Sequence, residues 1–534
     1  MHTRPPLRRF RDIPTRATAR LTAAFVTAAA LLVSACSAVS PGTPGSGTVD
    51  AALAALPRST PSALTPYYGQ RLHWRGCGVP GFQCATMKAP LDYARPGAGS
   101  VRLAVARKKA TGKGRPLGSL LVNPGGPGGS AVGYLQQYAG IGYPAQVRAR
   151  YDMVAVDPRG VARSEPVQCL DGPRMDAYTQ TDLTPDDQRE RSALVSAVQQ
   201  FAESCGARSA RLLRHVSTVE AARDMDILRA VLGDRRMNYV GASYGTFLGA
   251  TYAGLFPERV GRMVLDGAMD PSLDARTLTL DQTAGFETAF QAFARDCVRH
   301  ADCPLGGKGT TPARVGDRLK AFFRKLDARP VPAAGARGRR LGESLATTGV
   351  IAAMYDEGSW GQLRKALTSA MRKNDGAGLL ALADSYYERD ASGRYSNLMM
   401  ANAAVNCLDL PPAFTGPEEV ERSLPAFAKA SPVFGPGLAW ASLNCAYWPV
   451  RATGEPHRIE AKGAAPIVVV GTVRDPATPY RWAQSLARQL SSGRLLTYDG
   501  DGHTAYGRGS ACVDSAINAY LLRGTPPAAG KRCS

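Results

Sequence analysis

Two rhythms of apolar positions alternate through the middle of the chain. Residues 218–232 repeat apolar side chains about every 3.6 positions, which indicates a helix with Ala222, Met225 and Leu228 on its buried face. Short apolar runs typical of buried strands stand before and after it, at 101–106, 118–122, 153–156, 238–240 and 262–265. Strands that alternate with helices predict a parallel sheet covered by helices.

The pattern changes after residue 270. Residues 271–460 are mostly helical in pattern and show no strand series. Strand and helix patterns then resume, at 466–470, 479–490, 495–498 and 511–522. We therefore expect an α/β core in two parts, 67–270 and 461–534, with a mainly helical cap inserted at 271–460.

The N-terminus predicts export. Six arginines lie within residues 1–20 and precede an apolar stretch at 21–33, which is too short and too rich in alanine for a membrane span. Val33-Ser34-Ala35-Cys36 resembles the bacterial lipobox, whose cysteine becomes the lipidated first residue; the alternative is an ordinary signal peptide with a chance cysteine. We expect a signal peptide at 1–35, then a lipidated Cys36 and a flexible tether at 36–66. The protein is then anchored in the cell membrane and faces outside.

Charge and cysteine content agree with that compartment. The formal net charge is +21, and the lysines and arginines are scattered, which favours attraction to an anionic cell envelope and argues against nucleic-acid recognition. Of eleven cysteines, all but Cys36 form an even set that suggests five disulfides in an oxidising compartment. Pairing each cysteine with its nearest neighbour is one simple solution among many. Their spacing fits no zinc site, so we expect no metal.

A serine nucleophile is indicated at Gly241-Ala242-Ser243-Tyr244-Gly245. The string matches G-x-S-x-G, in which the serine occupies a tight turn between a strand and a helix. The string alone is weak, because this glycine-rich chain can produce it by chance. Its context strengthens it, since a predicted strand at 238–240 precedes the turn and a helical pattern follows to residue 255.

A base and an acid follow the serine in the order that this turn favours. His503 stands in a glycine-rich loop directly after the last predicted strand, where the base is expected. Asp475 follows the strand at 466–470, the usual position of the acid. Asp266, which follows the strand at 262–265, is the alternative acid.

The developing oxyanion needs backbone N–H donors. Tyr244, the residue after the nucleophile, supplies one, and Gly126 supplies the other from the glycine-rich segment 123–129 that follows the strand at 118–122. A nucleotide-binding loop is the competing interpretation, but the segment lacks G-x-G-x-x-G and a P-loop lysine. We expect no cofactor.

These motifs together resemble the tripeptidyl aminopeptidase group of α/β-hydrolases, which is related to prolyl aminopeptidases. The segment Asn-Pro-Gly-Gly-Pro-Gly-Gly-Ser130 is similar to the oxyanion loop of that group, with Pro124 where prolyl aminopeptidases carry histidine. The segment Asp157-Pro-Arg-Gly-Val-Ala-Arg-Ser164 resembles D-x-R-G-x-G-x-S, with Ala162 replacing a glycine. The resemblance also includes the serine turn, Arg474-Asp475-Pro476 and Gly502-His503, and covers about residues 72–522.

The resemblance implies an α/β-hydrolase fold and the removal of short peptides, such as tripeptides, from free N-termini through an acyl-enzyme on Ser243. Recognition of an α-ammonium group calls for carboxylates near the site, and Asp409 in the cap is a candidate. A solvated loop acid is the alternative interpretation of Asp409. Two other functions remain open: an esterase that uses the same three residues, and a non-catalytic envelope binding protein.

Overall fold

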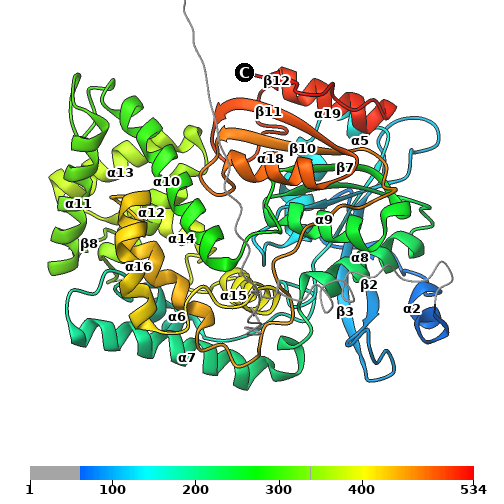
Figure 1. Ribbon diagram of the computed structural model, residues 1–534, viewed down its shortest axis with the longest axis horizontal. Helices are drawn as coiled ribbons and strands as arrows, with labels where there is room; N and C mark the ends of the chain where they lie inside the picture. The colour runs from blue at the N-terminus through cyan, green and yellow to red at the C-terminus, as the bar shows by residue number, and fades with distance from the viewer. Residues whose placement is uncertain (1–60, 337) are drawn as a thin grey trace, which may run out of the picture. The chain divides into compact units, whose positions relative to one another are not determined.

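Figure 1 shows the computed structural model, which describes residues 61–336 and 338–534. Cys36, the predicted signal peptide and most of the predicted tether lie outside the described residues. Within the part that is described, no helix combines the length and the apolar character needed to cross a membrane.

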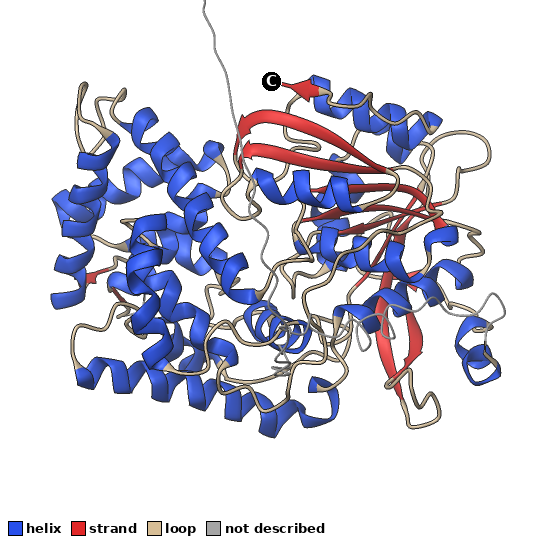
Figure 2. Ribbon diagram, viewed as in Figure 1, coloured by secondary structure: helices blue, strands red, loops and turns tan. Residues whose placement is uncertain are grey.

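One sheet of ten strands forms the centre of the described chain (Figure 2). In spatial order its strands are β1 (Arg75–Gly76), β2 (Gln83–Pro90), β3 (Ser100–Lys108), β5 (Asp152–Val156), β4 (Ser119–Asn123), β6 (Met237–Ala242), β7 (Val260–Asp266), β10 (Ile467–Arg474), β11 (Gly493–Asp501) and β12 (Arg532–Cys533). Strands β1 to β3 pair antiparallel, as does β3 with β5, and the strands from β5 to β12 are parallel. The predicted parallel sheet is confirmed, with an antiparallel edge that the pattern did not predict.

Both faces of the parallel strands are buried, which explains their continuous apolar runs. Leu121 of β4 packs into one layer, while Leu120 and Val122 pack into the other. The first layer includes α8 (Thr218–Val231), α9 (Tyr244–Leu255) and α18 (Tyr480–Gln489). The second includes α3 (Ala131–Tyr134), α5 (Ala145–Arg148) and α19 (Ala511–Arg523). This is the layered α/β architecture that the sequence predicts.

A group of helices lies on the side towards which the parallel strands point (Figures 1 and 2). It contains α10 (Ala275–Cys297), α11 (Pro312–Ala328), α12 (Glu343–Met354), α13 (Trp360–Lys373), α14 (Ala377–Tyr386), α15 (Leu398–Asp409), α16 (Pro417–Ala430) and α17 (Gly435–Ala441). Helices α10 to α14 share an apolar core of their own, separate from the two layers at the sheet. A two-stranded sheet of β8 (Val331–Pro332) and β9 (Arg340–Leu341) lies among them. We call this group the cap.

One helix that precedes residue 271, the expected start of the cap, packs against both the cap and the core. Helices α6 (Gly172–Thr179) and α7 (Gln188–Leu213) lie between β5 and β6 in the chain. Leu194 near the start of α7 packs with cap residues of α16 and α17, whereas Phe201 and Leu212 pack into the layer at the sheet. Helix α7 therefore joins the cap to the core, as its position in Figure 1 shows.

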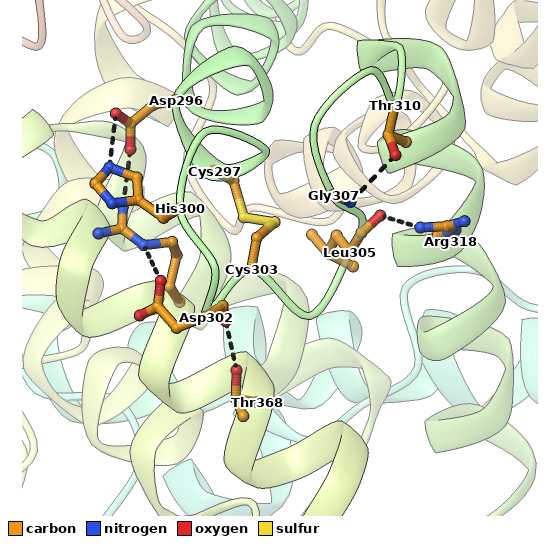
Figure 3. The surroundings of a disulfide bond; sticks show 11 residues. Asp296, Cys297, His300, Asp302, Cys303, Leu305, Gly307, Thr310, Arg318 and Thr368 are labelled. Carbon is orange, nitrogen blue, oxygen red and sulfur yellow. Dashed lines mark hydrogen bonds and ion pairs between the residues drawn. A yellow bond between two sulfur atoms is a disulfide. The ribbon is translucent and has the colours of Figure 1, made fainter.

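Five disulfides connect the cysteines in the nearest-neighbour pairing, namely Cys77–Cys84, Cys169–Cys205, Cys297–Cys303, Cys407–Cys445 and Cys512–Cys533. Figure 3 shows the pair that closes the turn after α10. Beside it, Asp296 pairs with His300 and with Arg364 of α13, and Arg364 also reaches Asp302. His300 thus belongs to a partly exposed ionic network of the cap.

Candidate active site

Ser243 occupies a strained turn between β6 and α9. Its φ is 57° and its ψ is −127°, a conformation that side-chain-bearing residues rarely adopt. The glycines on either side are required by space: a Cβ on Gly241 would lie 2.3 Å from the carbonyl oxygen of Gly245, and a Cβ on Gly245 would lie 2.8 Å from that of Asn123. The backbone N–H of Ser243 donates to the Asp266 carbonyl oxygen at 2.9 Å. The turn therefore projects Ser243 from the carboxyl end of β6.

His503 and Asp475 form a hydrogen-bonded pair at the same end of the sheet. The Nδ1 atom of His503 lies 2.9 Å from one carboxylate oxygen of Asp475 and 3.0 Å from the other. The Asp475 carboxylate is buried and also accepts the backbone N–H groups of Ala477 and Thr478, each at 2.9 Å, and the Thr478 hydroxyl at 3.0 Å. Because a carboxylate only accepts, His503 carries its proton on Nδ1.

The other ring nitrogen of His503 is available. Its Nε2 atom is buried and has no hydrogen-bond partner among the described residues. The backbone N–H of His503 donates to the carbonyl oxygen of Tyr355, which follows α12 of the cap. The Tyr355 and His503 rings pack edge to face with centroids 5.5 Å apart. An unpartnered imidazole nitrogen in a closed setting is suited to accept a proton.

The rival acid, Asp266, serves a different purpose. Its buried carboxylate accepts the backbone N–H groups of Ala505 at 3.0 Å and of Tyr506 at 2.9 Å. Burial raises the pKa of Asp266, and these two hydrogen bonds oppose the rise. No hydrogen bond joins Asp266 to His503 among the described residues, so Asp266 anchors the loop that carries the histidine.

The glycine-rich segment after β4 lies against the serine turn. A Cβ on Gly125, whose φ is 94°, would lie 2.8 Å from the Cβ of Ser243 and 2.9 Å from the backbone nitrogen of Tyr244. Tyr244 is the first residue of α9, so its N–H has no partner within the helix. Gly126 lines the cavity beside Ser243. The structure thus brings both expected oxyanion donors next to the nucleophile.

Two contacts hold this segment in place. Asp157, at the end of β5, accepts the Ser130 hydroxyl at 2.8 Å and the Val132 N–H at 2.9 Å. From the cap, the Asn402 side chain of α15 donates to the Pro127 carbonyl oxygen at 3.1 Å. The hydrophobic pattern does not reveal the contacts of Asn402 and Tyr355, because each depends on a residue distant in the chain.

Ser243 opens into a cavity of about 330 Å³ between core and cap. Core residues on its walls include Gly126 and Thr478, and cap residues include Gln282 of α10 and Asn402 of α15. The Gln282 side chain donates to the carbonyl oxygen of Ala477, two residues after Asp475. A covered cavity of this kind limits access to the serine.

Asp409, the candidate for an amine site, is not brought to this cavity. Its neighbours Asn406 and Leu410 line the walls, but Asp409 does not. Its buried carboxylate instead accepts the backbone N–H of Thr218 at 2.8 Å and the Thr218 hydroxyl, at the start of α8. Burial raises the pKa of Asp409 to about 7. The expectation of a substrate-facing acid at Asp409 is therefore corrected, because both carboxylate oxygens are directed at α8.

One cluster of acidic side chains among the described residues has the spacing of metal ligands. It consists of Asp182, Asp327 and Glu343, whose carboxylate oxygens lie within 4.8 Å of one another. None of the three lines the cavity at Ser243. The serine site thus contains the groups for acyl transfer without drawing on that cluster.

Comparisons with known proteins agree with this chemistry. A family model described as TAP-like protein matches residues 431–533. The serine protease Hip1 of Mycobacterium tuberculosis is 39% identical over 492 residues, which cover 88% of this chain and 92% of that protein. Carboxylesterase B of the same organism is 38% identical over 460 residues, covering 85% and 86%. The tripeptidyl aminopeptidase of Streptomyces coelicolor is 31% identical over 472 residues, covering 85% and 83%.

Proposed function

Because this chain belongs to the TAP-like family of α/β-hydrolases, we propose that it is a serine peptidase that releases short peptides, tripeptides in particular, from free N-termini. One observation carries the proposal: Ser243 stands on a strained turn and opens into a cavity bounded by the core and the cap, at the same end of the sheet as the His503–Asp475 pair. A covered cavity favours the end of a peptide chain over its middle.

The proposed reaction uses these groups in sequence. His503 Nε2 takes the proton of the Ser243 hydroxyl as its oxygen attacks the substrate carbonyl carbon, and Asp475 balances the imidazolium charge. The N–H groups of Gly126 and Tyr244 donate to the carbonyl oxygen as it becomes negative. The leaving amine then takes the proton from His503, and the acyl part remains as an ester on Ser243. Water, activated by the same histidine, releases the peptide.

Acetylating the substrate amine tests the peptidase class. A tripeptide anilide with a free amine should be cleaved with a kcat/KM roughly 10- to 150-fold higher than its acetylated form, since a charge-assisted hydrogen bond contributes ~1.5–3 kcal/mol. The two anilides are compared at one pH with the same enzyme preparation. Equal rates would contradict the aminopeptidase proposal while leaving the serine hydrolase chemistry intact.

An esterase is the second candidate, because a relative named carboxylesterase B is 38% identical over 85% of the chain. The same three residues can hydrolyse an ester, whose leaving group needs less protonation than an amine. A short-chain ester measured beside the free tripeptide anilide separates the two. A kcat/KM for the ester far above that of every peptide would favour this second function.

We further propose that the protein is exported and held at the membrane by lipid on Cys36. The support is the basic N-terminus, the apolar stretch and the lipobox-like Val33-Ser34-Ala35-Cys36. Replacing Cys36 with serine should release the protein into the soluble fraction with unchanged specific activity, because only the thiol can carry the thioether-linked lipid. Metabolic labelling with a fatty acid provides the measurement. Equal labelling of both proteins would contradict the anchor.

A further inference from the structure

A second cavity, of about 210 Å³, extends from the serine site into the cap. The two cavities share seven wall residues: Gln282, Tyr355, Tyr386, Met399, Leu438, Ala441 and Asn444. Shared wall residues mean that the two cavities adjoin. We call the second one the cap cavity.

The walls of the cap cavity are mostly apolar and aromatic, with Phe286 and Phe434 from the cap core among them. Among the described residues that form the wall, Glu343 is the one with an acidic or basic side chain. A hollow that served only an alkyl chain would gain nothing from a carboxyl group, since burying a charge without a partner is costly. The single carboxyl therefore points to a ligand that is apolar along its length and positive at one place.

Glu343 has no positive partner among the described residues. One of its oxygens accepts the Thr184 hydroxyl at 2.7 Å, and neither Glu343 nor its acidic neighbours Asp182 and Asp327 forms a salt bridge with any described residue. Burial, and then those negative neighbours, raise the pKa of Glu343 to about 7. A bound cation would relieve both effects, because it favours the ionised carboxylate.

Two orphaned polar atoms lie near this carboxyl. The Thr347 hydroxyl, one helical turn along α12 and also in the wall, is buried and lacks a hydrogen-bond partner among the described residues. One oxygen of Asp182 is in the same condition. Native proteins leave few buried polar atoms without partners, so the Thr347 hydroxyl in the wall also indicates a polar group that enters with a ligand.

Helix α12 gives the approximate length of the cap cavity. Glu343 begins α12, and Tyr355, which packs on His503, directly follows its end. At 1.5 Å per residue, about 18 Å of helix separate the two residues. An extended tripeptide covers roughly 10 Å. Both residues line the cap cavity, so its wall follows α12 over at least the length of an extended tripeptide.

We propose that the cap cavity binds the acyl half of the substrate and that Glu343 binds a positively charged nitrogen of that half. The nitrogen is either the α-ammonium group of the N-terminal residue or the ammonium group of a lysine side chain. The inference rests on the proposed function in one respect, that Ser243 hydrolyses a peptide bond. It adds a specificity-determining residue and a preference for apolar residues along the rest of the acyl half.

Replacing Glu343 with glutamine tests this assignment. Glutamine keeps the size of the side chain and can still accept the Thr184 hydroxyl, so only the charge is lost. We expect kcat/KM for a free tripeptide anilide to fall at least 10-fold, mainly through KM, while the acetylated anilide changes less than 2-fold. The matched control is Glu357→Gln, which removes an exposed acid just beyond α12 and should change kcat/KM for neither substrate.

Acetylated tripeptide anilides with lysine or norleucine at each position identify the source of the nitrogen. If Glu343→Gln lowers the rate only for free amines, the α-ammonium group is bound; if it lowers the rate only for lysine peptides, the side chain is bound. In the second case the wild-type enzyme cleaves free and acetylated peptides at equal rates. The aminopeptidase proposal then fails while this inference stands. Labelling of Ser243 by a fluorophosphonate confirms in each variant that the serine site is intact.

Two results would overturn the inference. One is a Glu343→Gln variant in which kcat/KM changes equally for charged and uncharged substrates while Ser243 is labelled normally. The other is a fall in the kcat/KM of wild-type enzyme on treatment with EDTA that equals the fall in Glu343→Gln and is reversed by calcium. A metal ion would then bind the three carboxylates.

Discussion

Replacing Ser243 with alanine should lower kcat by ~10³-fold or more while leaving the fold intact. The hydroxyl is the attacking atom in the proposed reaction, and no other group at the turn can form the acyl-enzyme. Alanine lacks only that oxygen, and its Cβ occupies the place of the serine Cβ, so the turn keeps its present contacts. The measurement is kcat for a free tripeptide anilide, with thermal unfolding as the control for folding.

The result must be read against enzyme that co-purifies from the expression host. A fluorophosphonate should label the wild-type protein and fail to label Ser243→Ala. Retention of most activity by purified, unlabelled Ser243→Ala would remove Ser243 from the mechanism. It would also remove the acyl-enzyme on which both the peptidase and the esterase proposals depend.

Replacing Asp475 with asparagine should lower kcat by ~10⁴-fold, the scale found when a buried triad aspartate loses its charge. The asparagine oxygen would keep the backbone N–H groups of Ala477 and Thr478. One of the two atoms that face His503 Nδ1 would then be a donor instead of an acceptor, which weakens the hold on the Nδ1 proton and favours the tautomer protonated on Nε2. A protonated Nε2 cannot take the proton of Ser243.

Asp266→Asn is the matched comparison, because both acids are buried at the carboxyl ends of neighbouring strands of the sheet. The asparagine oxygen can still accept from Ala505 or Tyr506, so we expect lower stability with a loss in kcat of about 10-fold or less. Kinetics and unfolding are measured on both variants. A greater loss in kcat for Asp266→Asn than for Asp475→Asn would assign the acid to Asp266.

These expectations also separate two kinds of information in the chain. The serine turn was predictable because its requirements are local: Gly241 and Gly245 stand beside Ser243, and their missing side chains allow the backbone to approach itself. The strands and helices around it were predictable for a similar reason, since burial on one face or on both leaves its period in neighbouring residues. The antiparallel edge from β1 to β3 was missed because pairing direction leaves no such period.

The candidate acids show that the local sequence pattern does not predict the partners of a carboxylate. Asp266 and Asp475 both follow buried strands, and only the folded chain directs Asp475 at His503 and Asp266 at the backbone of residues 505 and 506. Asp409 was a candidate for binding the substrate amine, yet its carboxylate accepts from Thr218, 191 positions away. A carboxylate accepts hydrogen bonds from the donors that tertiary packing places beside it, and the neighbouring sequence does not identify those donors.

The sequence by itself determined the α/β core, the serine turn, and the histidine loop, because each depends on spacing within a few residues. The tertiary structure decided the partner of His503, the closure of the serine cavity by the cap, and the place of Glu343 in the wall of the cap cavity. Those features join α7, α10, α12 and α15 to strands far away in the chain. Their geometry arises from burying several apolar surfaces at once, and no single segment carries that requirement.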